Sequence, residues 1–85
     1  MPTFAILDKG RNLGEKSCIL MENGALFGMG FISEDQSIEN ITLIKSVLTK
    51  YPSSDYMKSL IQNYAMRHPE KIISWKTKDC DLSLL

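Results

Sequence analysis

The chain has 85 residues, which suits one small domain with a modest core. Its 44% hydrophobic and 24% charged residues are ordinary for a globular domain and exclude a disordered or fibrous segment. Ten basic and ten acidic side chains give a net charge of zero, which argues against strong nonspecific binding to nucleic acid. Residues 1–44 contain three basic and six acidic side chains and residues 45–85 contain seven and four, so we expect the two halves to pair internally.

No apolar run approaches the ~20 residues of a membrane helix, and the first residues lack the features of a signal peptide. We therefore expect a cytoplasmic protein with no membrane partner. Cys18 and Cys80 lie far apart and form no C-x-x-C pair, so we interpret both as free thiols in a reducing compartment.

The first part of the chain predicts three antiparallel strands, at residues 3–8, 16–22 and 25–32. Residues 9–14 form the first loop, and Asn23-Gly24 predicts a two-residue type I′ turn. A turn of this length pairs Leu20 with Phe27 and gives the second hairpin two different faces. The expected core face holds Cys18, Leu20, Phe27, Met29 and Phe31. The other face carries Gly28 and Gly30, which would let another backbone or a bulky ring approach closely.

That second face also bears four apolar residues, which is more than a solvated face normally carries. Either another part of this domain covers them, or they form an interaction surface for a neighbouring domain or a second copy of the chain. The four residues are Ile19, Met21, Leu26 and Ile32.

The second half of the chain predicts two helices and a final strand. Ser37 is the expected N-cap of a helix whose apolar residues recur from Ile38 to Tyr51, before Pro52 ends it. Ser53 or Ser54 would cap a second helix that stops at His68-Pro69. Residues 71–76 predict the last strand, and the tail at 77–85 has no clear period. The fold class expected is therefore α+β, a three-stranded antiparallel meander followed by two helices and a final strand, in a single domain with its core at about residues 3–76.

The residues indicate no active site. His68, the only histidine, suits a helix end, and Cys18 falls on the expected core face, where a thiol is inert. Gly28-Met29-Gly30 lacks the third glycine of a phosphate-binding loop. We therefore expect no metal site and no cofactor in this chain, and no nuclease activity even with magnesium or manganese. A small stand-alone enzyme is the weakest of the readings.

Two glycine motifs carry a family resemblance, Asp8-x-Gly10-Arg11 with Glu15 and Gly28-x-Gly30-Phe31. Residues 4–32 resemble the C-terminal region of bacterial exonucleases that are similar to the DNA polymerase III epsilon subunit, a region that also occurs with GIY-YIG nuclease modules. The resemblance implies a parent enzyme of the DEDD type that hydrolyses DNA from 3′ to 5′ with two divalent metal ions. The catalytic carboxylates, histidine and tyrosines of those enzymes lie in motifs that these 85 residues lack, so no catalytic residue is carried over.

Two functions follow as hypotheses. The chain is either a non-catalytic accessory domain of such an exonuclease, docking onto its catalytic domain or positioning DNA, or a protein-interaction or dimerisation module unrelated to nucleases. If the domain contacts DNA, a phosphate would bind at the first loop, where backbone amides and cations can hold it. The candidate residues are Lys9, Arg11, Asn12 and Lys16. The alternative for Arg11 is an ion pair with Asp8 or Glu15 that only makes the loop rigid.

Overall fold

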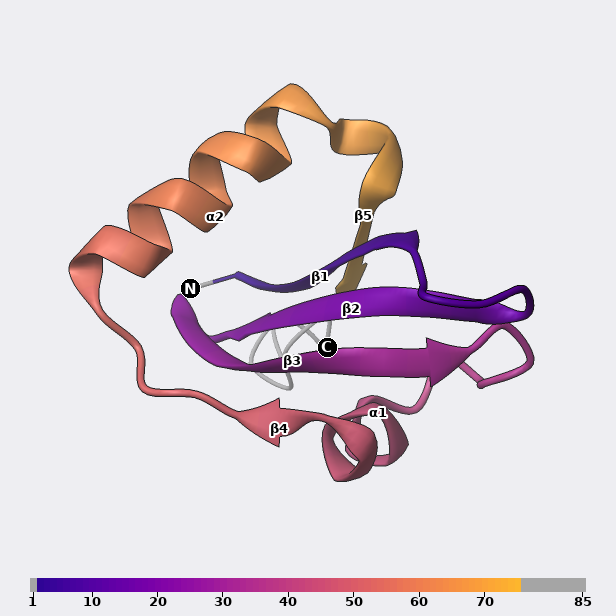
Figure 1. Ribbon diagram of the computed structural model, residues 1–85. Helices are drawn as coiled ribbons and strands as arrows, with labels where there is room; N and C mark the ends of the chain where they lie inside the picture. Colours follow the sequence, from indigo (N-terminus) through magenta and orange to yellow (C-terminus); the bar gives the residue numbers. More distant parts are fainter. Residues whose placement is uncertain (1, 76–85) are drawn as a thin grey trace, which may run out of the picture.

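The computed structural model describes residues 2–75, so the tail at 77–85 and Cys80 lie outside the described residues. An antiparallel sheet has the strand order β4-β3-β2-β1-β5, with α2 on one face and α1 on the other (Figure 1). This is the expected α+β fold, with a meander, two helices and a final strand. In chain order the elements are β1 (Thr3–Lys9), β2 (Glu15–Glu22), β3 (Ala25–Ser33), α1 (Ile41–Val47), β4 (Thr49–Lys50), α2 (Asp55–Arg67), the 3₁₀ turn η1 (Pro69–Lys71) and β5 (Ile72–Trp75).

The turn between β2 and β3 has the expected type I′ conformation, because Asn23 (φ 53°) and Gly24 (φ 82°) both have positive φ. Its backbone is also tied to the start of the chain. The Asn23 N–H donates to Thr3 Oγ1 at 3.1 Å, and the Gly24 N–H donates to the Pro2 carbonyl at 3.0 Å. These bonds hold the turn against the beginning of β1.

The expected pairing of β2 with β3 is right for the first two pairs and wrong beyond them. Met21 faces Leu26 as a two-residue turn requires, but Leu20 faces Gly28 instead of Phe27. Phe27 is the extra residue of a β-bulge, and its carbonyl accepts a hydrogen bond from the Tyr51 N–H at 3.2 Å. The bulge exchanges the two sides of β3 from this point on. Met29 therefore packs with the cluster that contains Met21, and Ile32 packs with the cluster that contains Cys18 and Leu20.

The first helix is shorter than expected and is followed by a strand. Asn40, not Ser37, is its N-cap, and the Asn40 side chain accepts from the Thr42 and Leu43 N–H groups. After Val47 the backbone becomes extended and β4 pairs with Gly28 and Met29. The missing side chain of Gly28 is what admits this strand, because a Cβ there would lie 2.9 Å from the Thr49 carbonyl carbon.

The sheet has a buried cluster on each face, which explains why both sides of its strands are apolar. Under α1, the buried residues are Ala5, Cys18, Leu20, Ile32, Ile44 and Leu48. Under α2, they are Phe4, Ile6, Met21, Leu26 and Ile61. Burial raises the pKa of the Cys18 thiol to about 11, which keeps it protonated at neutral pH.

The interaction surface expected on the hairpin must therefore be corrected. Met21 and Leu26 are buried beneath α2, and Ile19 packs against the same cluster. Ile32 is buried on the opposite face, because the bulge turns it toward α1. This chain buries Met21, Leu26 and Ile32 with its own elements, and Ile19 is half-buried, so the four residues do not form one open surface.

The second helix agrees with the sequence. Ser54 is its N-cap and accepts from the Met57 N–H at 3.1 Å, and the helix ends where His68 precedes Pro69. The chain then enters β5, whose Trp75 ring N–H donates to the Ile38 carbonyl at 2.8 Å. This hydrogen bond joins the last strand to the segment that precedes α1.

Candidate nucleic-acid interface

The loop between β1 and β2 projects from one end of the sheet, beside the turn that follows β3 (Figure 1). Two backbone hydrogen bonds fix it at both ends. The Gly10 N–H donates to the Glu15 carbonyl at 3.1 Å, and the Glu34 N–H donates to the Gly14 carbonyl at 2.9 Å. A Cβ on Gly10 would lie 2.5 Å from that Glu15 oxygen, so this close approach requires glycine. The loop residues and Glu34 line an open hollow of about 590 Å³.

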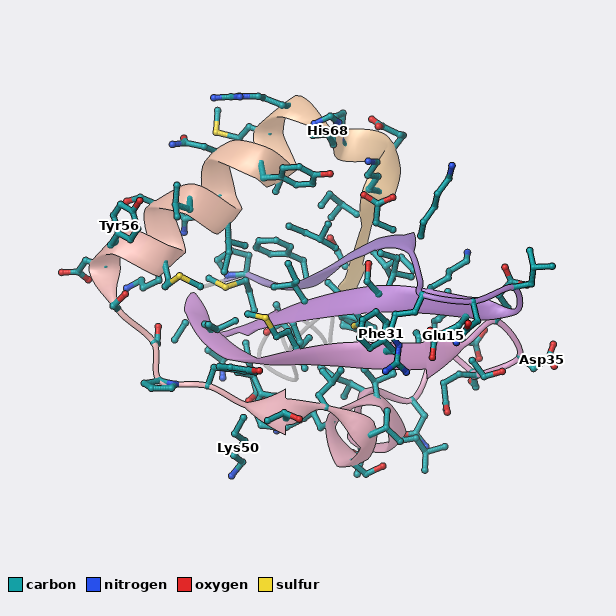
Figure 2. All side chains as sticks on the ribbon, in the orientation of Figure 1. Glu15, Phe31, Asp35, Lys50, Tyr56 and His68 are labelled. Carbon is teal, nitrogen blue, oxygen red and sulfur yellow. The ribbon has the colours of Figure 1, made fainter. Side chains whose placement is uncertain are left out.

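Arg11 braces this loop from within. Its guanidinium contacts both carboxylate oxygens of Glu15, at 2.7 and 3.2 Å, while the Arg11 backbone N–H donates to the same carboxylate at 3.0 Å. The hydrogen bonds from Arg11 lower the pKa of Glu15 and raise the pKa of Arg11 itself. The guanidinium also lies 4.0 Å from the centre of the Phe31 ring on β3. Figure 2 shows Glu15 and Phe31 together at this end of the sheet.

Of the two interpretations of Arg11, the structure thus contains the ion pair with Glu15. Asp8, the other proposed partner, binds Lys71 instead, with Nζ at 2.8 Å from Oδ2. The Tyr64 hydroxyl donates to the same oxygen at 3.1 Å. These contacts join β1 to the end of α2 and to η1. The hydrogen bond from Lys71 is the main cause that lowers the pKa of Asp8 to about 2, and the bond to Asp8 raises the pKa of Lys71.

Lys9 and Lys16 remain as exposed cations at the base of the loop. They are direct partners across the β1–β2 ladder, so their side chains project from the same face of the sheet. Neither takes part in an ion pair within residues 2–75. Two like charges at adjacent positions repel each other, and an anion between them would relieve that repulsion. Lys9 and Lys16 therefore form a small exposed patch of positive charge at the base of the loop.

The tip of the loop carries Asn12 and Leu13, both exposed. The Asn12 side-chain amide can offer both donors and an acceptor to a ligand. Leu13 is fully exposed, at 103% of its reference area. Sequence reasoning missed Leu13, although an apolar residue between Asn12 and Gly14 in a polar loop is a signal that could have been used.

The acidic residues of this end of the sheet are paired with cations of this chain. Asp8 and Glu15 are each bound by a cation of this chain, Lys71 and Arg11 respectively. Throughout residues 2–75, no three side chains of histidine, cysteine, aspartate or glutamate come together as metal ligands would.

A second exposed region lies on the helices and was not predicted. On the outer side of α1, Leu43 and Val47 are about half exposed and lie one turn apart. Along α2, Tyr56, Leu60 and Tyr64 recur every four residues and are also exposed. Tyr56 stands away from the sheet in Figure 2.

Comparison of the chain with family models, with curated proteins and with solved structures finds no significant match. Among the helices described, none is long and apolar enough to cross a membrane.

Proposed function

We propose that this chain is the non-catalytic accessory domain of a 3′–5′ exonuclease similar to the DNA polymerase III epsilon subunit, and that it positions DNA for that enzyme in replication or repair. One observation carries the proposal. The motif that resembles the family builds a single braced loop, and that loop holds Lys9 and Lys16 outward as unpaired cations within the described residues.

Each charged residue of the first motif has a structural role that supports this assignment. Asp8 ties β1 to η1, and the ion pair of Arg11 with Glu15 closes the loop. The two glycines of the second motif, Gly28 and Gly30, let β4 and Leu48 approach β3. These structural roles agree with a domain that shapes a binding surface and takes no part in hydrolysis.

The partner expected is the catalytic domain of the same enzyme, which would supply both metal ions; the accessory domain itself would need no cofactor. The cytoplasm is the expected location, where the Cys18 thiol stays reduced. Because the two domains would be joined, even weak contact with DNA raises the local concentration of substrate at the catalytic domain.

The test measures the salt dependence of DNA binding by fluorescence anisotropy with a labelled oligonucleotide that has a single-stranded 3′ end. Two phosphate contacts predict a slope of about −1.4 to −1.8 in a plot of log K against log salt. Removing both cations, as Lys9→Gln with Lys16→Gln, should bring the slope close to zero. Lys50→Gln is the matched control, because Lys50 is an exposed lysine on the edge strand β4, away from the loop (Figure 2). Equal slopes for the double variant and the control would contradict the proposal.

A second function, a protein-interaction or dimerisation module, is favoured by the exposed apolar side of α1. Leu43 and Val47 are 47% and 49% exposed, and such a face suits a second copy of the chain or the catalytic domain. Sedimentation equilibrium tests the homodimer. Dimerisation that is lost in Leu43→Glu, with no DNA binding by either protein, would favour this function over the first.

A further inference from the structure

A cleft of about 280 Å³ lies between α2 and the ladder of β1 and β2. Its apolar walls are formed by Ile6, Ile19, Leu60 and Ile61. Leu60 is 48% exposed and Ile19 is only half-buried, so water in the cleft touches apolar surface from both the helix and the sheet. Displacement of this water by an apolar ligand is favourable.

One end of the cleft is polar. It is formed by Asp8, Ser17 and Tyr64. Asp8 and Ser17 are direct partners across the β1–β2 ladder, and the pair Ile6 and Ile19 lies two residues away on the same face of the strands. The strand register therefore places a polar pair next to an apolar pair, so a ligand in the cleft would contact both.

The groups at the polar end retain capacity for hydrogen bonds. The Tyr64 hydroxyl donates to Asp8 Oδ2 and accepts from Lys71 Nζ, both at 3.1 Å, which leaves one lone pair on its oxygen. Asp8 Oδ1 accepts from the Lys9 backbone N–H at 2.8 Å. The half-buried Ser17 hydroxyl can both donate and accept. A ligand hydroxyl at this end can therefore donate to one group and accept from another.

Charge decides which kind of polar group fits. Asp8 Oδ2 lies 2.8 Å from Lys71 Nζ, and this hydrogen bond is the main cause that lowers the pKa of Asp8 to about 2. Both side chains are therefore charged at neutral pH, and together they have no net charge. A cation in the cleft would be repelled by Lys71, and an anion would be repelled by Asp8. A charged group would also lose part of its hydration, whereas an uncharged hydroxyl avoids both costs.

We propose that this cleft is a binding site for a small uncharged molecule with two fused apolar rings and one hydroxyl, which forms hydrogen bonds with Ser17 and Tyr64. A closed cavity of ~150 Å³ lined by aliphatic side chains holds one benzene ring, so a cleft of about 280 Å³ suits two rings. Lys9 and Lys16 alternate with Asp8 and Ser17 along the strands and project from the opposite face. The site therefore goes beyond the proposed contact with DNA and does not depend on it.

The probe is 2-naphthol, compared with naphthalene-2-carboxylate and 2-naphthylmethylammonium, which carry the same rings with a negative and a positive group. Each is titrated into the ¹⁵N-labelled chain and followed in ¹H–¹⁵N spectra. 2-Naphthol should shift the amide signals of residues 6–8, 17–19 and 60–64 in a saturable way, with a Kd of about 1 mM or lower. The two charged probes should bind about fivefold more weakly or less tightly still.

Three variants locate the site. Leu60→Trp places a larger side chain in the cleft and should abolish binding of 2-naphthol. Leu43→Trp is the matched control, because Leu43 is 47% exposed on α1 at the other face of the sheet, and it should bind as the wild type does. Ser17→Ala removes one hydrogen bond to the ligand and should raise the Kd about two- to tenfold.

The results that would overturn the proposal are equally definite. If 2-naphthol shifts none of these signals at 1 mM, or if Leu60→Trp binds as the wild type does, the cleft is not the site. If all three probes bind equally, or if Ser17→Ala leaves the Kd unchanged, the polar end does not select an uncharged hydroxyl. Each of these results leaves the proposed contact with DNA untouched, because Lys9 and Lys16 test that contact separately.

Discussion

Replacing Gly28 by alanine tests whether the approach of β4 to the bulge of β3 is essential to the fold. An added Cβ would lie 2.9 Å from the Thr49 carbonyl carbon, still closer to its oxygen, and 3.1 Å from Lys50 Cα. These are backbone atoms, which cannot rotate away as the end of a side chain can. We therefore expect β4 to separate from β3 and the hydrogen bond from the Tyr51 N–H to the Phe27 carbonyl to be lost.

The effect on stability follows from the known range for overpacked cores. Such substitutions lower the free energy of unfolding by about 1–3 kcal/mol, and the lost hydrogen bond places Gly28→Ala at about 2–3 kcal/mol. A domain of this size loses about 4–8 °C of melting temperature per kcal/mol, so the decrease should be about 10–20 °C.

Gly30→Ala is the matched control, because a Cβ there would meet Leu48 Cδ2 at 3.3 Å, the end of a side chain that can adjust. Its cost should stay below about 1 kcal/mol. Urea denaturation followed by circular dichroism gives both values. If Gly28→Ala is no less stable than Gly30→Ala, the role assigned to the second glycine motif is wrong.

Three further predictions concern single residues. The pKa of Asp8 is about 2 in the folded protein against an ordinary 3.8, so its contribution to stability is fully present above about pH 4 and is lost as the pH falls toward 2. The melting temperature of Asp8→Asn should therefore depend less on pH than that of the wild type between pH 4 and pH 2. Leu20→Ala removes a side chain with 0% exposure and should reduce the free energy of unfolding by about 2–5 kcal/mol in urea titrations. Leu60→Ala, at 48% exposure, should reduce it by less than about 1 kcal/mol, and equal losses would contradict the assigned core. Burial raises the pKa of the Cys18 thiol to about 11, so in a Cys80→Ser background this thiol should react with a thiol reagent far more slowly in buffer than in urea. Fast reaction in buffer would show that the sheet face under α1 opens readily.

The fold could be predicted from the sequence wherever the signal was local. The type I′ turn depends on Asn23 and Gly24 alone, and the second helix is bounded by the Ser54 cap and by Pro69. The final strand also lies where its apolar residues indicate.

The rest depended on contacts between distant residues. The bulge at Phe27 makes its contacts about twenty residues further along the chain, where β4 pairs with Gly28 and Met29 and the Tyr51 N–H donates to the Phe27 carbonyl. The periodicity of residues 38–51 predicts one long helix. The missing side chain of Gly28, however, leaves room for Thr49 and Lys50 to pair with β3 as strand β4. A one-residue shift of this kind moves side chains to the other face, which is why Met29 and Ile32 were misplaced.

The candidate site was predicted only in part. The first loop and its glycine were evident from the sequence, and the structure contains one of the two partners proposed for Arg11. The choice between Asp8 and Glu15 depended on Lys71, which is far away in the sequence and binds Asp8. The pairing of Lys9 with Lys16 follows from the strand register, which the loop length alone does not fix.

The central claim is that the loop between β1 and β2 contacts DNA. Its most direct test is to titrate the ¹⁵N-labelled chain with an oligonucleotide carrying a mismatched 3′ end and to follow the ¹H–¹⁵N spectra. We predict that the largest changes in chemical shift occur at residues 9–16 and at the neighbouring Glu34, and that they shrink as salt is raised from about 50 to 200 mM. Changes confined to α1 and β4, or no changes at any residue, would contradict it.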